Sequence, residues 1–145
     1  MNEEDHGTER HDDKATVPAD SALRVLVVDD DVEVGSAVVR ALEHIGHTGV
    51  RCGHAQEALD ALAAQPFDVL LVDYRMPDMT GLDLITLLRH EGCKIPAIMM
   101  TGHFATEDRL PGEQLGIYTL LRKPITLPVL ARALEERMLI TRHSA

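Results

Sequence analysis

The amino-acid sequence predicts an α/β domain in which a five-stranded parallel sheet is covered by helices on both faces. From Leu23 onward, short apolar runs alternate strictly with amphipathic segments, which is typical of strand–helix units joined by right-handed crossovers. The apolar runs are almost continuous and rich in Val, Leu and Ile, and this indicates strands that are buried on both faces. A length of 145 residues suits one such domain and is too short for two separate cores.

The first half of the domain is predicted to hold two strand–helix units. The first strand is a β-branched run that ends abruptly at three aspartates, and the helix after it carries apolar residues at helical spacing up to Gly46. The second strand is weaker, and Pro66 stops the Ala- and Leu-rich helix that follows it. Strands are therefore expected over residues 24–28 and 48–52, and helices over residues 32–45 and 54–64.

The second half is predicted to hold three further strands and two clear helices. The third strand runs up to Asp73, the fourth ends at Thr101, and the fifth is followed by Lys123 and Pro124. Strands are expected over residues 67–72, 96–100 and 117–121, and helices over residues 82–90 and 127–140.

The segment between the fourth and fifth strands is the least regular. It contains Pro111 and Gly112, and both residue types disfavour a continuous helix. Any helix over residues 103–116 is therefore expected to be short or broken, and we hypothesise that it is mobile.

Polar side chains stand at the carboxyl ends of four of the predicted strands. Each residue has a commoner explanation by itself, because an aspartate after a strand often caps a helix and Lys-Pro and Thr-Gly are ordinary loop pairs. In a parallel sheet, however, these strand ends meet at one edge, where ligands bind. The residues that the fold would bring together are Asp29, Asp30 and Asp31 after the first strand, Asp73 after the third, Thr101 after the fourth and Lys123 after the fifth. Asp30 or Asp31 is also expected to cap the first helix.

Such a set of side chains favours phosphoryl transfer. Carboxylates gathered in one pocket repel each other and need a cation, and Mg²⁺ is the cation that works with one or two carboxylates and a phosphate. Lys123 would add a second positive charge, and Thr101 would donate a hydroxyl hydrogen bond to a phosphoryl oxygen. A carboxylate can itself be the nucleophile and form an aspartyl phosphate.

Composition and charge exclude several other classes of protein. A net charge of −10 and only four aromatic residues leave no basic or stacking surface for nucleic acid. Residues 1–22 hold seven acidic and two basic residues and are expected to be a disordered leader. There is no apolar run of roughly 18 residues that could span a membrane, no signal peptide, and no CxxC pattern in Cys52 and Cys93. We therefore expect a cytoplasmic protein that binds neither nucleic acid nor membrane.

Residues 23–140 resemble the receiver domain of bacterial two-component response regulators, of the kind found in chemotaxis regulators. The resemblance rests on VLVVDDD at 25–31, LVDYRMPDMTG at 71–81, IMMTG at 98–102 and RKP at 122–124. It implies a flavodoxin-like (βα)5 three-layer sandwich with strand order 2-1-3-4-5, followed by a C-terminal tail over residues 141–145.

The resemblance also implies roles for individual residues. Asp73 would be the phosphoacceptor, and Thr101 and Lys123 would contact the phosphoryl oxygens. The peptide bond between Lys123 and Pro124 would be cis. Mg²⁺ would be bound by Asp73, by Asp30 directly, by Asp29 directly or through a water, and by the backbone carbonyl of Arg75.

The resemblance further implies partners and a mode of action. The phosphoryl donor would be a sensor histidine kinase or a histidine phosphotransfer protein. The output would be binding to a downstream protein or transfer of the phosphoryl group within a relay. The domain would be a phosphoacceptor rather than an enzyme, although it takes part in its own phosphorylation and dephosphorylation.

Two regions depart from the family pattern. Receivers usually place Tyr or Phe three residues before the lysine, where this chain has Leu120. We interpret Leu120 as a core residue, and the alternation of side chains along a strand predicts that Tyr118 shares its face. The usual aromatic readout would then be absent or altered.

Arg75 and His103, each two residues beyond a site residue, are expected to tune the lifetime of the phosphoryl group.

Alternatives to a stand-alone receiver remain open at this point. The last helix is predicted to end near the C-terminus, which leaves no room for an output domain, but the chain could also be a fragment of a hybrid histidine kinase or of a DNA-binding response regulator. A Mg²⁺-dependent phosphohydrolase would need Asp-x-Asp at the nucleophile, whereas Tyr74 and Arg75 follow Asp73. A flavodoxin-like cofactor binder would need a Ser/Thr/Gly-rich loop where the aspartates stand.

Overall fold

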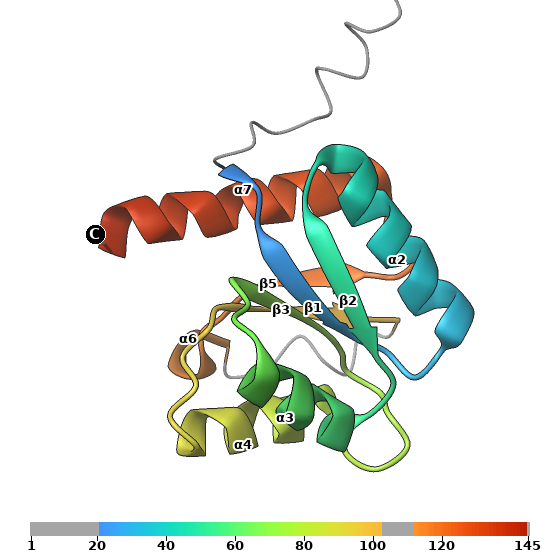
Figure 1. Cartoon of the computed structure of the whole chain (residues 1–145), viewed down its shortest axis with the longest axis vertical. Coiled ribbons are helices and arrows are strands. Elements are labelled where there is room, and N and C mark those ends of the chain that lie inside the picture. Colours follow the sequence, from blue (N-terminus) through green and yellow to red (C-terminus); the bar gives the residue numbers. More distant parts are fainter. Residues whose placement is uncertain (1–20, 103–111, 145) are drawn as a thin grey trace, which may run out of the picture.

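The computed structural model describes residues 21–102 and 112–144, and the remaining residues lie outside the described part of the chain. Strands and helices alternate along it (Figure 1). The strands are β1 (Arg24–Val28), β2 (Thr48–Cys52), β3 (Val69–Asp73), β4 (Ala97–Thr101) and β5 (Ile117–Arg122). The helices are α2 (Val32–Ile45), α3 (Ala55–Ala64), α4 (Gly81–His90), α6 (Gly112–Leu115) and α7 (Leu127–Ser144).

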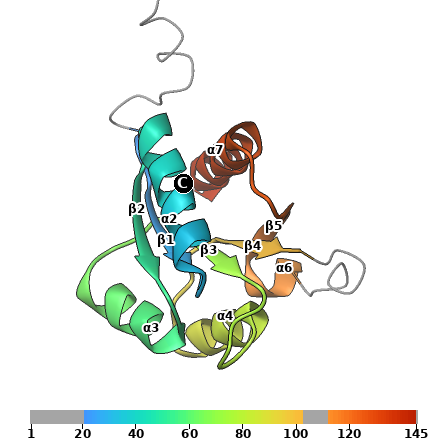
Figure 2. The ribbon, with the colours of Figure 1, turned by 90° about the vertical axis from the view of Figure 1, so that its right-hand side faces the viewer.

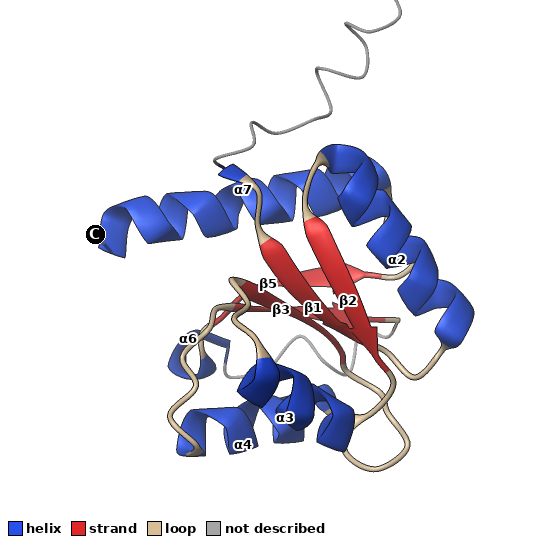
Figure 3. Ribbon diagram, viewed as in Figure 1, coloured by secondary structure: helices blue, strands red, loops and turns tan. Residues whose placement is uncertain are grey.

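The five strands form one parallel sheet in the order β2-β1-β3-β4-β5, which confirms the predicted fold and strand order. The sheet is the middle of three layers, with helices above and below it (Figure 3). Helices α2 and α7 cover one face, and α3, α4 and α6 cover the other (Figure 2).

Each face of the sheet packs its own aliphatic core. On the face of α2 and α7, Val27, Leu71 and Met100 meet Leu42 and Leu134. On the opposite face, strand residues such as Leu70 and Met99 meet Ala58, Leu84 and Ile85 of α3 and α4. Alternate residues of β1, β3 and β4 therefore face opposite helical layers, and this explains why the strands are apolar without interruption.

The helix ends follow from local side-chain chemistry. Asp31 is the N-cap of α2 and accepts a hydrogen bond from the backbone N–H of Val34 at 3.1 Å. Thr80 and Asp83 form a reciprocal capping box at the start of α4, with hydrogen bonds of 3.0 and 3.1 Å. These caps fix the start of each helix directly beside the carboxyl ends of β1 and β3.

Element boundaries differ from the prediction at a few places. The third strand begins at Val69 rather than at residue 67, and α4 begins at Gly81 because the capping box precedes it. Helix α7 continues to Ser144, past the predicted end at residue 140. In the irregular segment, α6 is a single turn at Gly112–Leu115, which agrees with the predicted short or broken helix. The rest of that segment, including His103 and its predicted mobility, lies outside the described residues.

One prediction about β5 is wrong. The register between β4 and β5 shifts so that Ala97 pairs with Ile117 and Ile98 pairs with Thr119, which makes Tyr118 an extra residue. Tyr118 consequently packs with the core under α7, whereas Leu120 packs with the core under α3 and α4. The two side chains lie on opposite faces of the sheet and not on the same face.

The acidic leader over residues 1–20 lies outside the described residues, so its predicted disorder stays a prediction. The same holds for the domain boundaries near residues 22 and 140. Among the described residues, no helix is both long and apolar enough to cross a membrane.

Candidate functional site

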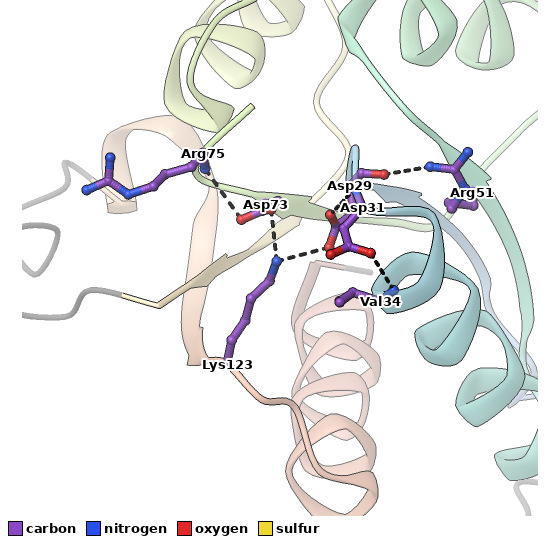
Figure 4. A network of polar contacts seen from close by, with 7 residues as sticks. All are labelled: Asp29, Asp31, Val34, Arg51, Asp73, Arg75 and Lys123. Atoms are coloured by element: carbon purple, nitrogen blue, oxygen red, sulfur yellow. Dashed lines mark hydrogen bonds and ion pairs between the residues drawn. The ribbon is translucent and has the colours of Figure 1, made fainter. Parts of the chain in front are cut away.

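The carboxyl edge of the sheet brings the predicted site residues together (Figure 4). Parallel registers align the strand ends: Val28 of β1 pairs with Val72, which directly precedes Asp73, and Thr101 of β4 pairs with Arg122, which directly precedes Lys123. Side chains that follow four different strands therefore converge at one place, as their positions in the sequence predict.

Asp29 is the most enclosed residue of the site, with no exposed surface. One carboxylate oxygen accepts from the backbone N–H of Asp31 at 2.9 Å, and the other accepts from Nζ of Lys123 at 3.1 Å. Its backbone N–H donates to the carbonyl of Cys52 on β2 at 3.0 Å. Both the carboxylate and the backbone of Asp29 are thus held in place.

Asp73 ends β3 and is also buried. Its Oδ2 accepts from Nζ of Lys123 at 2.9 Å, and its Oδ1 faces the backbone N–H of Arg75 across a longer 3.4 Å contact. Burial raises the pKa of the Asp73 carboxyl; the hydrogen bond and charge of Lys123 oppose this, and the charge of Asp29 adds to it. The carboxylate form of Asp73 is therefore under electrostatic strain that a cation would relieve.

Lys123 is shared between the two buried carboxylates. Burial by itself lowers the pKa of its ammonium group, but the hydrogen bonds and charges of Asp73 and Asp29 outweigh burial and raise that pKa. Lys123 therefore stays charged at neutral pH. Its backbone N–H donates to the carbonyl of Thr101 at 2.8 Å, and the peptide bond to Pro124 is cis, as predicted.

Asp29, Asp30 and Asp73 fit a divalent cation. One ligand oxygen from each of the three lies within 4.8 Å of the others, and Asp30 is exposed whereas Asp29 and Asp73 are buried. Carboxylate oxygens are the ligands that Mg²⁺ and Ca²⁺ prefer. Three carboxylates beside one ammonium group leave a net negative charge, so the donor set and the local charge both suit such an ion. Asp31 caps α2 instead and takes no part in this cluster.

The remaining predicted residues are Thr101 and Arg75. Thr101 is buried at the end of β4, next to Asp73 in the sheet order. The side chain of Arg75 extends away from Asp73, with its guanidinium carbon 5.9 Å from the centre of the Tyr74 ring (Figure 4). The roles predicted for the Thr101 hydroxyl and the Arg75 carbonyl stay predictions.

The structure adds two residues that sequence reasoning missed. Arg51, at the end of β2, donates from Nη1 to the backbone carbonyl of Asp29 at 2.7 Å. Gly81 packs so closely that a Cβ there would lie 2.5 Å from the backbone oxygen of Asp73. Gly81 belongs to a stretch that the resemblance singled out, but no pattern in the sequence points to Arg51, because its contact depends on how β2 lies beside β1.

Comparison with known proteins agrees with this geometry. A family model described as a response regulator receiver domain matches residues 25–135. The DNA-binding transcriptional regulator NtrC of Escherichia coli (strain K12) is 38% identical over 113 residues, which is 78% of this chain and 24% of NtrC. The receiver domain of the Francisella response regulator 1452 superposes with a TM-score of 0.74 at 26% identity, covering 82% of this chain and 98% of that domain.

A third similar protein is the response regulator TrrA of Thermotoga maritima, whose structure was solved in complex with Mg²⁺-BeF. It superposes with a TM-score of 0.70 over 79% of this chain and 98% of TrrA, and at 20% identity it shows the shared fold alone. The chain spans between 24% and 56% of the length of the curated relatives NtrC and QseB.

Proposed function

This chain belongs to the response regulator receiver family, a family of two-component signalling domains, and we propose that it accepts a phosphoryl group on Asp73 from a phosphohistidine donor with the help of Mg²⁺. The observation that carries the proposal is the arrangement of Asp73 itself. It is a buried carboxylate at a strand end, paired with Lys123 at 2.9 Å and adjoining two further carboxylates.

Asp73 is the carboxylate best placed to act as the nucleophile. Both oxygens of Asp29 already accept good hydrogen bonds, from Asp31 and from Lys123. In contrast, Oδ1 of Asp73 has a single long contact to the N–H of Arg75, and this leaves a lone pair for phosphorus. Burial of Asp73 also raises its pKa, which makes its ionised oxygen a stronger base than that of an ordinary aspartate.

Transfer of the phosphoryl group to Asp73 is a displacement at phosphorus. An oxygen of Asp73 forms the new P–O bond while the P–N bond to the donor imidazole breaks, and the imidazole leaves with that electron pair and takes up a proton. Lys123 would stabilise the negative charge on the phosphoryl oxygens, and Thr101 would donate a hydrogen bond to one of them. Mg²⁺ held by Asp29, Asp30 and Asp73, with the Arg75 carbonyl, would neutralise charge on the phosphoryl group and on the carboxylates.

The partners of the domain follow from this chemistry. A sensor histidine kinase or a histidine phosphotransfer protein would supply the phosphoryl group, and a downstream protein would read the phosphorylated surface or receive the phosphoryl group in a relay. A receiver within a longer regulator remains the alternative.

Both cysteines are free thiols, which supports a reducing cytoplasmic location.

Phosphorylation by a small donor tests the proposal. The protein is incubated with acetyl phosphate and Mg²⁺, and its intact mass is measured. Wild type is expected to gain the mass of one phosphoryl group, and Asp73→Asn to gain none. Asp60→Asn is the matched control, because Asp60 is an exposed aspartate on α3 whose side chain accepts a hydrogen bond from Gln56 of the same helix. An equal gain in Asp73→Asn, or steady hydrolysis of phosphate esters without any adduct, would contradict the proposal.

A further inference from the structure

Arg51 lies beside the acidic pocket without facing it. It comes from the end of β2, and Figure 4 shows it approaching Asp29 from the side opposite to Lys123. Its Nη1 donates to the backbone carbonyl of Asp29 at 2.7 Å, a short hydrogen bond in which the donor is charged. Arg51 therefore touches the backbone of a site residue and not its carboxylate.

That carbonyl belongs to the peptide group that joins Asp29 to Asp30, two members of the carboxylate cluster. The end of β2 holds this part of the chain twice, because the N–H of Asp29 also donates to the carbonyl of Cys52 at 3.0 Å. A rotation of the peptide group would swing both carboxylates relative to Asp73. Arg51 resists such a rotation by fixing the direction of the carbonyl.

Gly35 makes room for Arg51. A Cβ at this position of α2 would lie 2.5 Å from Cδ and 2.9 Å from Cγ of Arg51, so the stem of the arginine rests directly on the bare backbone of the helix. A glycine inside a helix destabilises that helix relative to alanine. The close approach of Arg51 explains why glycine, and not alanine, occupies this buried helical position.

We propose that Arg51, seated on Gly35, is a positioning residue for the metal site and holds the Asp29–Asp30 peptide group in the orientation that binds Mg²⁺. This inference rests on the proposed function, because it assumes that the carboxylate cluster binds Mg²⁺. Contacts outside the ligands orient metal ligands in just this way, and their loss weakens metal binding.

The positive charge of Arg51 has the opposite effect on Mg²⁺ affinity. The direction of the change in affinity therefore distinguishes positioning from electrostatic repulsion. A guanidinium near the carboxylate cluster repels a cation. If this repulsion were the only effect of Arg51, its removal would tighten Mg²⁺ binding. Gly35→Ala separates the two effects, since it keeps the charge and displaces the side chain from Asp29. Positioning predicts weaker binding in both Arg51→Ala and Gly35→Ala.

The experiment is a calorimetric titration of the full chain with Mg²⁺, for wild type, Arg51→Ala, Gly35→Ala and the double variant. Each single variant is expected to raise the Mg²⁺ dissociation constant on the order of 10-fold. The double variant is expected to bind like Arg51→Ala, because alanine at position 35 then has nothing to displace. Urea unfolding of the same proteins should show that Gly35→Ala stabilises the Arg51→Ala background.

Three outcomes would overturn the inference: unchanged affinity in Arg51→Ala, tighter binding in Arg51→Ala, or losses that add in the double variant. If Gly35→Ala does not fold, the affinity of Arg51→Ala decides alone. The failure of the proposed function looks different, since wild type itself would then neither bind Mg²⁺ nor gain a phosphoryl group from acetyl phosphate. Wild type that does both while the variants match it would overturn the positioning role alone.

Discussion

Asp29 and Asp73 are two buried carboxylates that share the single ammonium group of Lys123. The arrangement is asymmetric, because Asp29 accepts two good hydrogen bonds whereas Asp73 has one good partner and one long contact. Burial raises the pKa of Asp73 despite its ion pair with Lys123. The charge of the Asp73 carboxylate is therefore only partly compensated by Lys123.

The raised pKa of Asp73 predicts a pH-dependent difference in stability. A raised pKa in the folded state means that the folded protein binds more protons than the unfolded chain, so the contribution of Asp73 to stability is lost as pH rises through that pKa. Metal-free Asp73→Asn, which does not titrate, should gain in free energy of unfolding relative to wild type as pH rises from 3.8 toward neutrality. Urea unfolding followed by circular dichroism in a chelator measures this, and Asp60→Asn should track wild type. A difference that does not change with pH would be evidence against it.

Removal of Lys123 should have the opposite effect. Lys123→Ala leaves Asp29 and Asp73 without their shared positive partner, and the metal-free protein should lose about 1–3 kcal/mol of stability near neutral pH. Lys94→Ala is the control, because Lys94 is exposed and precedes the amino end of β4, at the edge of the sheet opposite to the site. Added Mg²⁺ should restore part of the loss by binding the two carboxylates. Equal stability of the two variants would show that the ion pairs contribute nothing.

The site could be predicted from sequence wherever strand position determined it. Asp29, Asp73, Thr101 and Lys123 lie together because parallel strands end at one edge, and that rule needs no knowledge of side-chain packing. Arg51 could not be found in this way. Its contact requires that β2 lie beside β1 and that Gly35 leave space above it, and both are tertiary facts.

At the scale of the elements, α4 packs against the strand that carries Asp73. The capping box at Thr80 and Asp83 sets the start of the helix, and Gly81 brings its first turn against the Asp73 backbone. A side chain at Gly81 would also lie within 3.0 Å of Val72 and Met99. The position of Asp73 thus depends on a close contact between a helix start and a strand end.

Gly81→Ala tests this contact. A Cβ 2.5 Å from a backbone oxygen forces the helix and the strand apart, so the variant should lose about 1–3 kcal/mol of stability although alanine favours helix formation. Gly102→Ala is the control, because a Cβ there meets nothing within 4 Å. Thermal unfolding of both variants measures the difference. If both variants unfold at the same temperature as wild type, the contact is not close in solution.

The bulge in β5 shows where strand periodicity fails as a predictor. Side chains alternate between the two faces of a sheet only while each residue pairs in register. Because Tyr118 is an extra residue, the residues after it face the opposite side of the sheet from the one that strict alternation predicts. The phenol of Tyr118 donates to the carbonyl of Ala133 in α7 at 2.9 Å, and burial raises its pKa. Tyr118 is thus tied to the last helix, on the opposite face from Leu120, and cannot replace an aromatic side chain at that position.

At the scale of the whole molecule, the order of apolar and amphipathic segments predicted the architecture well. Strand order and the two helical layers match, and the helix and strand bounds differ from the predicted ones by a few residues. The length of α7 could not be predicted, because periodicity weakens toward the end of the chain. The helices that follow β1, β3 and β5 are α2, α4 and α7, so their first turns lie beside the edge of the sheet that carries the candidate site. The proposed phosphoryl donor and downstream partner would approach this edge.

Chemical trapping of the acyl phosphate is the sharpest test of whether Asp73 carries the phosphoryl group. Wild-type protein phosphorylated with acetyl phosphate and Mg²⁺ is treated with borohydride, which reduces an aspartyl phosphate to homoserine, and its peptides are sequenced by mass spectrometry. We expect homoserine at position 73 in a Mg²⁺-dependent yield, with Asp29, Asp30 and Asp78 unchanged. Homoserine at any of those three positions, with Asp73 intact, would contradict it.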